Sequence, residues 1–314
     1  MISINPFFSV VIPTYNRADV LSRSVDSVLG QVFQNFELII VDNGSADDTQ
    51  KWLSRNYQDD RIVYHYQEGS GSPASPRNVG MSLAKGQWIC LLDSDDRWDK
   101  RKLQFVFDTI QKNTDSDVIC HNENIYYETT DRIGKVLKYG PVSNNMYKEM
   151  LILGNRLSTS ATSIRAKFIK KNNLQFNELD EFAIVEDYDL WLNLAKCNAN
   201  FVFIPESLGF YTVGEYNMIA NSDLYCENLR NLLEMHSFNI QQFSDDKEKL
   251  WKLLKLRFDI CKIQHSKASL LKKLISVFKI WIVHPINLTK IILGYAKRKL
   301  SKDFNFASSL RKKY

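Results

Sequence analysis

Short apolar runs alternate with segments of helical period through the first 93 residues, and this alternation restricts the fold more than any other feature. The apolar runs lie at 7–13, 37–42, 61–67 and 87–93, and the helical segments at 17–31, 46–55 and 78–86. Strands that are apolar throughout and joined by helices indicate a parallel sheet covered on both faces. The sequence therefore predicts an α/β fold, with a mostly parallel, Rossmann-like sheet flanked by helices.

Polar residues follow three of these strands where each strand is expected to end. The three clusters are Pro13-Thr14-Tyr15, Asp42-Asn43-Gly44-Ser45 and Asp93-Ser94-Asp95-Asp96. Ligands of open parallel sheets bind beyond the carboxyl ends of the strands. We therefore predict that the three clusters converge on one cleft.

The third cluster places three carboxylates, Asp93, Asp95 and Asp96, within four positions. Like charges this close repel and raise the pKa of one another. A hard cation such as Mg²⁺ or Mn²⁺ relieves that repulsion and also neutralises a diphosphate. The alternative is a charged turn with solvated acids, but the position after an apolar strand favours a metal.

Three further polar residues have two interpretations each. Asp42 accepts a hydrogen bond from a nucleotide base, or it caps the next helix together with Ser45. Tyr15 stacks on the base or packs under a loop. Arg77 meets a phosphate or forms a surface ion pair.

The rest of the chain is mixed and then helical. Strands are predicted at 117–128, 160–165, 201–205 and 208–213, and helices at 185–196 and from about 219 onward. In the helix at 185–196, Leu190, Trp191 and Leu194 share one face, and the acids occupy the first turn, where they favour the helix dipole.

Five segments, taken in order, resemble the family 2 glycosyltransferases. They are VVIPTYNR (10–17), VDNGSADDT (41–49), SPRNVG (75–80), LLDSDDRW (91–98) and VEDYDLWLNLA (185–195). The order and spacing match over about residues 1–215. The resemblance implies the GT-A fold, a nucleotide-sugar donor that is usually UDP-linked, a Mn²⁺ or Mg²⁺ ion, and inversion at the anomeric carbon.

The resemblance also implies a set of donor-binding residues. Asp42 holds the uracil, Arg77 lies near the base and phosphates, and Pro13, Thr14, Tyr15, Arg17 and Ser94 contribute to the nucleotide site. Asp93-Ser94-Asp95 is the family's DxD motif, in which Asp95 binds the metal and Asp93 faces the ribose or the metal shell.

The general base implied by the resemblance is Asp187, and Glu186 and Asp189 remain alternatives. Pro76 and Asn193 depart from the residues usual in the family, which leaves the donor-sugar and acceptor contacts open. No QxxRW motif is present, which argues against a processive synthase.

Charge divides the chain unevenly. Residues 251–314 contain 16 Lys and Arg but only Asp259 and Asp303 as acids, so this segment carries +14 and residues 1–250 carry −9 of the net +5. Segment 270–300 mixes large apolar and basic residues, and an amphipathic helix pair broken near Pro285 would bind an anionic membrane surface. The alternative is a set of helices packed on the catalytic body. Nucleic acid is not expected as a partner, because no recognised module accompanies the charge.

We expect a GT-A catalytic domain over 1–218, with a nucleotide-binding half at about 1–115 and an acceptor-binding half at about 116–218, followed by a basic helical region over 219–314. No signal peptide or spanning helix is expected. The five scattered cysteines, with no CxxC pair, fit a reducing compartment.

The family resemblance and the basic tail together predict non-processive, inverting transfer of a sugar to a saccharide acceptor that is lipid-linked, during surface polysaccharide assembly such as that of O-antigen, capsule or lipooligosaccharide. The predicted location is cytoplasmic, at the inner face of the cytoplasmic membrane. Three alternatives remain: a soluble saccharide or protein acceptor, a nucleotide-sugar-binding protein without turnover, and a nucleotidyltransferase.

Overall fold

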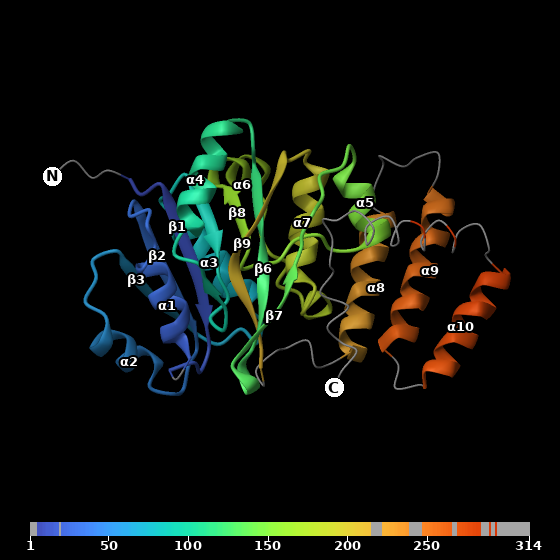
Figure 1. The fold of residues 1–314 in the computed structure, drawn as a ribbon, viewed down its shortest axis with the longest axis horizontal. Helices are drawn as coiled ribbons and strands as arrows, with labels where there is room; N and C mark the ends of the chain where they lie inside the picture. Colours follow the sequence, from blue (N-terminus) through green and yellow to red (C-terminus); the bar gives the residue numbers. More distant parts are fainter. Residues whose placement is uncertain are drawn as a thin grey trace.

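The computed structural model describes residues 5–18, 20–214, 222–238, 247–265 and 269–283, together with Thr289 and Leu293. Its strands are β1 (Phe8–Thr14), β2 (Phe36–Asn43), β3 (Ile62–Gln67), β4 (Trp88–Leu91), β5 (Arg97–Trp98), β6 (Val118–Tyr127), β7 (Arg132–Leu137), β8 (Thr162–Arg165) and β9 (Phe201–Val213). Its helices are α1 (Leu21–Leu29), α2 (Thr49–Asn56), α3 (Ala74–Leu83), α4 (Lys102–Lys112), α5 (Met146–Leu153), α6 (Ala166–Asn172), α7 (Glu186–Lys196), α8 (Ser222–Phe238), α9 (Lys247–His265) and α10 (Leu270–Val283). The strands form one sheet with helices on both faces (Figure 1).

The first four strands make the predicted parallel half of the sheet. Their spatial order is β3-β2-β1-β4, and every neighbouring pair is parallel. Thr14 at the end of β1 pairs with Asp42 near the end of β2, and Val11 pairs with Leu91 at the end of β4. The three polar clusters therefore leave the sheet along one edge, as the sequence predicted.

The second half of the sheet is mixed. β8 runs antiparallel to both β4 and β6, whereas β9 runs parallel to β6 and antiparallel to β5. The prediction of two strands at 201–205 and 208–213 is wrong, because β9 is one strand of 13 residues. Its pairing with β6 shifts register near Asn122, whose side chain donates to the Pro205 carbonyl at 2.7 Å. Such an irregularity lets a proline, which has no N–H to donate, stay within a strand.

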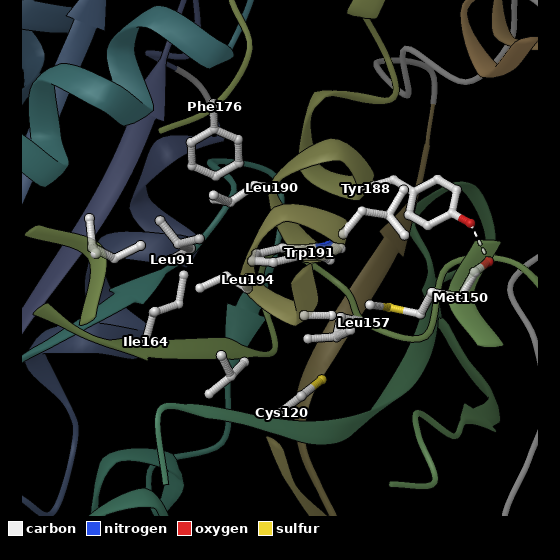
Figure 2. Packing of buried hydrophobic residues seen from close by; sticks show 14 of the residues in the cluster. Leu91, Cys120, Met150, Leu157, Ile164, Phe176, Tyr188, Leu190, Trp191 and Leu194 are labelled. Atoms are coloured by element: carbon white, nitrogen blue, oxygen red, sulfur yellow. Dashed lines mark hydrogen bonds between the residues drawn. The ribbon is translucent and has the colours of Figure 1, made fainter. Parts of the chain in front are cut away.

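The core lies on both faces of the sheet, as continuous apolar strands require. Val10 and Ile12 of β1 belong to the cluster that α1, α2 and α4 cover, and Val11 between them belongs to the cluster on the opposite face. This opposite cluster includes residues of α3, α5, α6, α7, α8 and α9. Figure 2 shows Trp191 and Leu194 of α7 inside it, near the sheet residue Ile164.

The C-terminal helices lie side by side beyond the sheet (Figure 1). α8 packs against α9, and α10 packs against α9 through Val277 and Ile280, which contact Leu256. The predicted break near Pro285 lies outside the described residues. Within those residues, no helix combines the length and apolarity needed to cross a membrane.

Candidate active site

The loops after β1 and β2 are held together by hydrogen bonds. Asn16 adopts a positive φ of 49°, its N–H donates to Ser45 Oγ at 2.8 Å, and its Oδ1 accepts from the Ala46 N–H at 2.8 Å. Pro13 and Thr14 are buried at the end of β1, whereas Tyr15 is 55% exposed. The exposed Tyr15 ring is available to stack on a base. Its role in nucleotide binding stays a prediction.

Asp42 is buried and has two partners within the protein. Its Oδ1 accepts from the Ser45 N–H at 2.8 Å, and its Oδ2 accepts from the Tyr64 hydroxyl at 2.7 Å. This contact closes the loop after β2, and the predicted helix cap by Asp42 and Ser45 is wrong, because α2 begins only at Thr49 with Asp48 before it. A carboxylate has about four lone-pair positions, so the two contacts leave acceptor capacity, and the bond to a nucleotide base stays a prediction. The sequence did not indicate the contact of Asp42 with Tyr64 of β3.

The acidic turn after β4 points in two directions. Asp96 is buried, and its carboxylate accepts from Ser160 Oγ at 2.6 Å and from the Thr212 N–H at 2.7 Å. Burial, followed by the Asp95 carboxylate, holds the pKa of Asp96 well above its usual value. Ser94 is also buried, whereas Asp93 and Asp95 keep side-chain exposures of 30% and 24%. Only these two acids of the turn remain open to a ligand.

Asp95 is destabilised as an anion. Burial and the neighbouring Asp93 carboxylate raise its pKa to about 6, against the opposing effect of Arg17. The nearest Arg17 nitrogen lies 3.7 Å from Asp95 Oδ2. A further cation bound next to Asp95 would stabilise its ionised carboxylate, because the cation offsets the effects of burial and of Asp93.

Arg77 joins the acidic turn to the acids of α7. One guanidinium nitrogen donates to Asp93 at 2.6 Å and another donates to Glu186 at 2.7 Å. Arg77 is 5% exposed and also lies over the Phe176 ring. Burial lowers its pKa, but the Asp93 and Glu186 carboxylates outweigh burial and raise it. The surface ion pair considered for Arg77 is excluded, because Arg77 is a buried bridge.

Asp187 follows Glu186 at the start of α7 and is partly exposed. Its pKa is raised to about 7, first by burial and then by the Glu186 carboxylate, while Arg77 acts in the opposite direction. Thr159 Oγ1 lies 3.5 Å from Asp187 Oδ2. A carboxylate with a pKa near neutrality suits a general base. Of the two alternatives, Glu186 is buried with one oxygen bound to Arg77, and Asp189 is buried among helices away from the turn.

The Asp93 and Asp95 carboxylates fit a divalent cation that takes its other ligands from phosphate oxygens and water. Among the described residues, no group of three or more His, Cys, Asp or Glu side chains is placed to hold a metal ion by itself. Mg²⁺ sites of phosphate-transferring enzymes commonly use one or two carboxylates plus phosphate oxygens and water. Asp93 and Asp95, both partly exposed and mutually repelling, provide such a pair.

The sequence did not indicate that residues 159–160 contact both the acidic turn after β4 and the acids at the start of α7. Ser160 Oγ accepts from the Asp93 N–H at 3.1 Å while it donates to Asp96, and Thr159 faces Asp187. The only hint in the sequence is a run of small hydroxyl residues ahead of β8, and its partners are too distant along the chain to infer.

Replacing Arg77 by methionine is expected to lower the free energy of unfolding by about 3 kcal/mol, because the buried Glu186 carboxylate and the partly exposed Asp93 carboxylate lose their shared cation. Urea unfolding measures this. Adding Glu186→Gln should restore part of the loss. The control is Arg101→Met, whose exposed ion pair with Asp99 should contribute little to stability. Equal small losses in both variants would contradict a stabilising bridge.

Comparison with known proteins identifies the family and the fold. The model for "Glycosyl transferase family 2" matches residues 9–171. An uncharacterized glycosyltransferase of Rickettsia bellii is 34% identical over 71% of this chain and 31% of its own length. An Escherichia coli protein, UDP-Glc:alpha-D-GlcNAc-diphosphoundecaprenol beta-1,3-glucosyltransferase WfaP, is 33% identical over 59% of this chain and 69% of its own.

The fold is shared with a solved structure. Staphylococcus aureus TarS, crystallised with UDP-GlcNAc, superimposes with a TM-score of 0.61 at 21% identity, over 86% of this chain and 78% of that one. The predicted GT-A fold is thus confirmed. This chain spans less than half the length of several relatives that it matches. The family model covers more than half of the sequence, and the chain belongs to glycosyl transferase family 2.

Proposed function

We propose that this protein is an inverting, non-processive glycosyltransferase that moves a hexosyl or N-acetylhexosaminyl group from a UDP-sugar to a hydroxyl of a lipid-linked saccharide. Surface polysaccharide assembly, as for O-antigen, capsule or lipooligosaccharide, is the proposed setting. The observation that carries the proposal is the Arg77 bridge, which brings the Asp93 turn beside the helix of Asp187, a carboxylate with a pKa of about 7.

The mechanism assigns one base. Asp187 accepts the proton of the acceptor hydroxyl, whose oxygen attacks the anomeric carbon from the face opposite the nucleotide. A single displacement of this kind inverts the centre. Asp95 and Asp93 would hold Mn²⁺ or Mg²⁺, which stabilises the charge that develops on the departing diphosphate. Tyr15, Thr14, Asp42 and the neighbouring loops orient the nucleotide.

The choice of donor and acceptor has support from two similar proteins. The name of the E. coli relative specifies UDP-Glc and a diphosphoundecaprenol-linked acceptor, and TarS was crystallised with UDP-GlcNAc. The proposal extends a UDP-sugar donor and a lipid-linked acceptor to this chain.

Calorimetric titration with UDP, GDP and dTDP, each with and without Mn²⁺, tests the donor site. We expect UDP to bind in a Mn²⁺-dependent manner and the other two nucleotides to bind more weakly. Transfer from radiolabelled UDP-sugars to a diphosphoundecaprenol-linked saccharide then tests turnover. Donor binding without transfer to lipid-linked, soluble or protein acceptors would favour a nucleotide-sugar-binding protein. Release of pyrophosphate from an NTP would favour a nucleotidyltransferase.

We further propose that α10 places the enzyme on the cytoplasmic face of the membrane. One side of α10 packs on α9, and the other exposes large apolar side chains, with Lys272 and Lys279 also exposed. The exposed apolar residues are Leu271, Leu274, Ile275, Phe278 and Ile282. A helix with this composition lies in the interface of an anionic bilayer, where its lysines meet lipid headgroups.

Replacing Lys272 and Lys279 together by alanine is expected to weaken binding to vesicles of anionic phospholipid by roughly 30-fold. Each basic residue near such a surface contributes about 1 kcal/mol. Cosedimentation with vesicles measures the change. Replacing the exposed Lys167 and Lys170 of α6 makes the matched control. An equal loss in both double variants would remove α10 as the specific contact.

A further inference from the structure

We propose that His236 on α8 is a positioning residue for sugar transfer, which holds α7 through Asp189 and thereby fixes Asp187 in the cleft. This inference rests on the proposed role of Asp187 as the base. His236 lies beyond the segment matched by the family model, in the region that the sequence indicated only as helical.

The contact between α8 and α7 is buried and directional. His236 Nε2 lies 2.8 Å from Asp189 Oδ1, and the side chains are 3% and 4% exposed. Asn193 donates to the other oxygen of Asp189 at 3.0 Å. On the far side of the imidazole, Nδ1 lies 3.0 Å from the Tyr147 hydroxyl of α5. Tyr147, His236 and Asp189 therefore form a line of hydrogen bonds from α5 through α8 to α7.

Helix geometry connects this anchor to the proposed base. Residues two apart on a helix do not face the same side. Asp189 accordingly faces the helices while Asp187 keeps part of its surface open. Apolar contacts of Leu190 and Trp191 hold α7 close to its neighbours, but they are non-directional. A directional bond at Asp189 sets the rotation of the helix about its axis, and with it the direction of Asp187.

Two further buried side chains attach the same region to the C-terminal helices. Asn228 of α8 donates to the carbonyl of Ala183 at 2.9 Å and to that of Asp180 at 3.2 Å, in the segment just before α7. Arg257 of α9 donates to the Tyr188 hydroxyl at 3.1 Å. Tyr188 itself donates to the Met150 carbonyl of α5 (Figure 2). Polar contacts thus hold the chain both before Asp187, at Asp180 and Ala183, and directly after it, at Tyr188.

His236→Ala and His236→Gln, made in the full chain, test the proposal. Glutamine can still donate to Asp189, whereas alanine cannot. We expect His236→Ala to lower kcat by about 10- to 100-fold, as small displacements of a reacting group do, while KM for the donor stays within about twofold because the strand-end loops are unchanged. His236→Gln should recover most of kcat. The control is Arg230→Gln, an exposed residue of α8.

Hydrogen exchange supplies a readout that needs no turnover. Amides in peptides covering 183–196 should exchange faster in His236→Ala than in the wild type, and at nearly the wild-type rate in His236→Gln. If His236→Ala does not fold, Asp189→Ala, which removes the acceptor of His236, takes its place and should show the same acceleration. Unchanged exchange, or an unchanged kcat in a folded His236→Ala, would overturn the inference. Absence of transfer by the wild type with every donor would instead overturn the proposed function and leave the exchange result to decide the positioning role.

Discussion

Asp187→Asn is expected to lower kcat for sugar transfer by about 10²–10⁴-fold, the usual contribution of general base catalysis. The amide keeps the size of the side chain but cannot take up the proton of the attacking hydroxyl. KM for the UDP-sugar should change by no more than about twofold, because Asp187 serves the acceptor. Initial rates at saturating donor measure the effect. The matched control is Glu181→Gln, an exposed acid ahead of α7 that should leave the rate unchanged.

The pH profile identifies the base independently. Asp187 must be ionised to accept a proton, and its pKa is raised to about 7. The kcat of the wild type should therefore fall about tenfold per pH unit below 7 and level off above it. Asp187→Asn should lose this acidic limb. A retained limb in Asp187→Asn, together with its loss in Glu186→Gln, would transfer the role to Glu186.

Asp95→Asn is expected to abolish most of the Mn²⁺-dependent binding of UDP, with a loss of about 100-fold or more in affinity, since a neutral amide is a poor ligand for a hard cation. Calorimetry with and without Mn²⁺ measures it. Asp60→Asn, at an exposed acid, is the matched control. Wild-type affinity in Asp95→Asn would mean that the metal is held elsewhere.

The same substitution should stabilise the protein without ligand. The folded pKa of Asp95, about 6, lies above its ordinary value of 3.8 because of burial and Asp93. Ionising such a group costs folding free energy above pH 6, and the cost disappears below about pH 4, where the group is protonated in both states. At pH 7.5, Asp95→Asn should therefore gain on the order of 1–3 kcal/mol in unfolding free energy. Loss of binding with a gain in stability would separate a ligand role from misfolding.

The sequence predicted those features that depend on neighbours along the chain. The alternation of apolar runs and helical segments was sufficient for β1 to β4, and the acids that follow β4 marked the site. The helix carrying Asp187 was also expected, with Trp191 on its buried face.

Features that depend on distant partners did not emerge from the pattern. Arg77 and Glu186 are 109 positions apart, so no spacing rule reveals their ion pair. His236 and Asp189 are 47 positions apart on different helices. The sequence predicts two strands where β9 is a single one, because Pro205 interrupts the apolar pattern. The pairing with β6 shows that the strand continues past Pro205. A histidine or arginine in isolation is equally compatible with a solvated surface and with a buried partner.

The attachment of α7 to α8 and α9 bears on where the working enzyme ends. The segment that the family model matches stops at residue 171, before the proposed base and before its anchors Asn228, His236 and Arg257. A chain shortened to that segment would keep the nucleotide side of the site and lack the side that takes the proton. The shortest piece that retains every anchor of α7 described above reaches Arg257, and completing its helix takes it to His265. The segment matched by the family model and the proposed catalytic unit thus have different boundaries in this molecule.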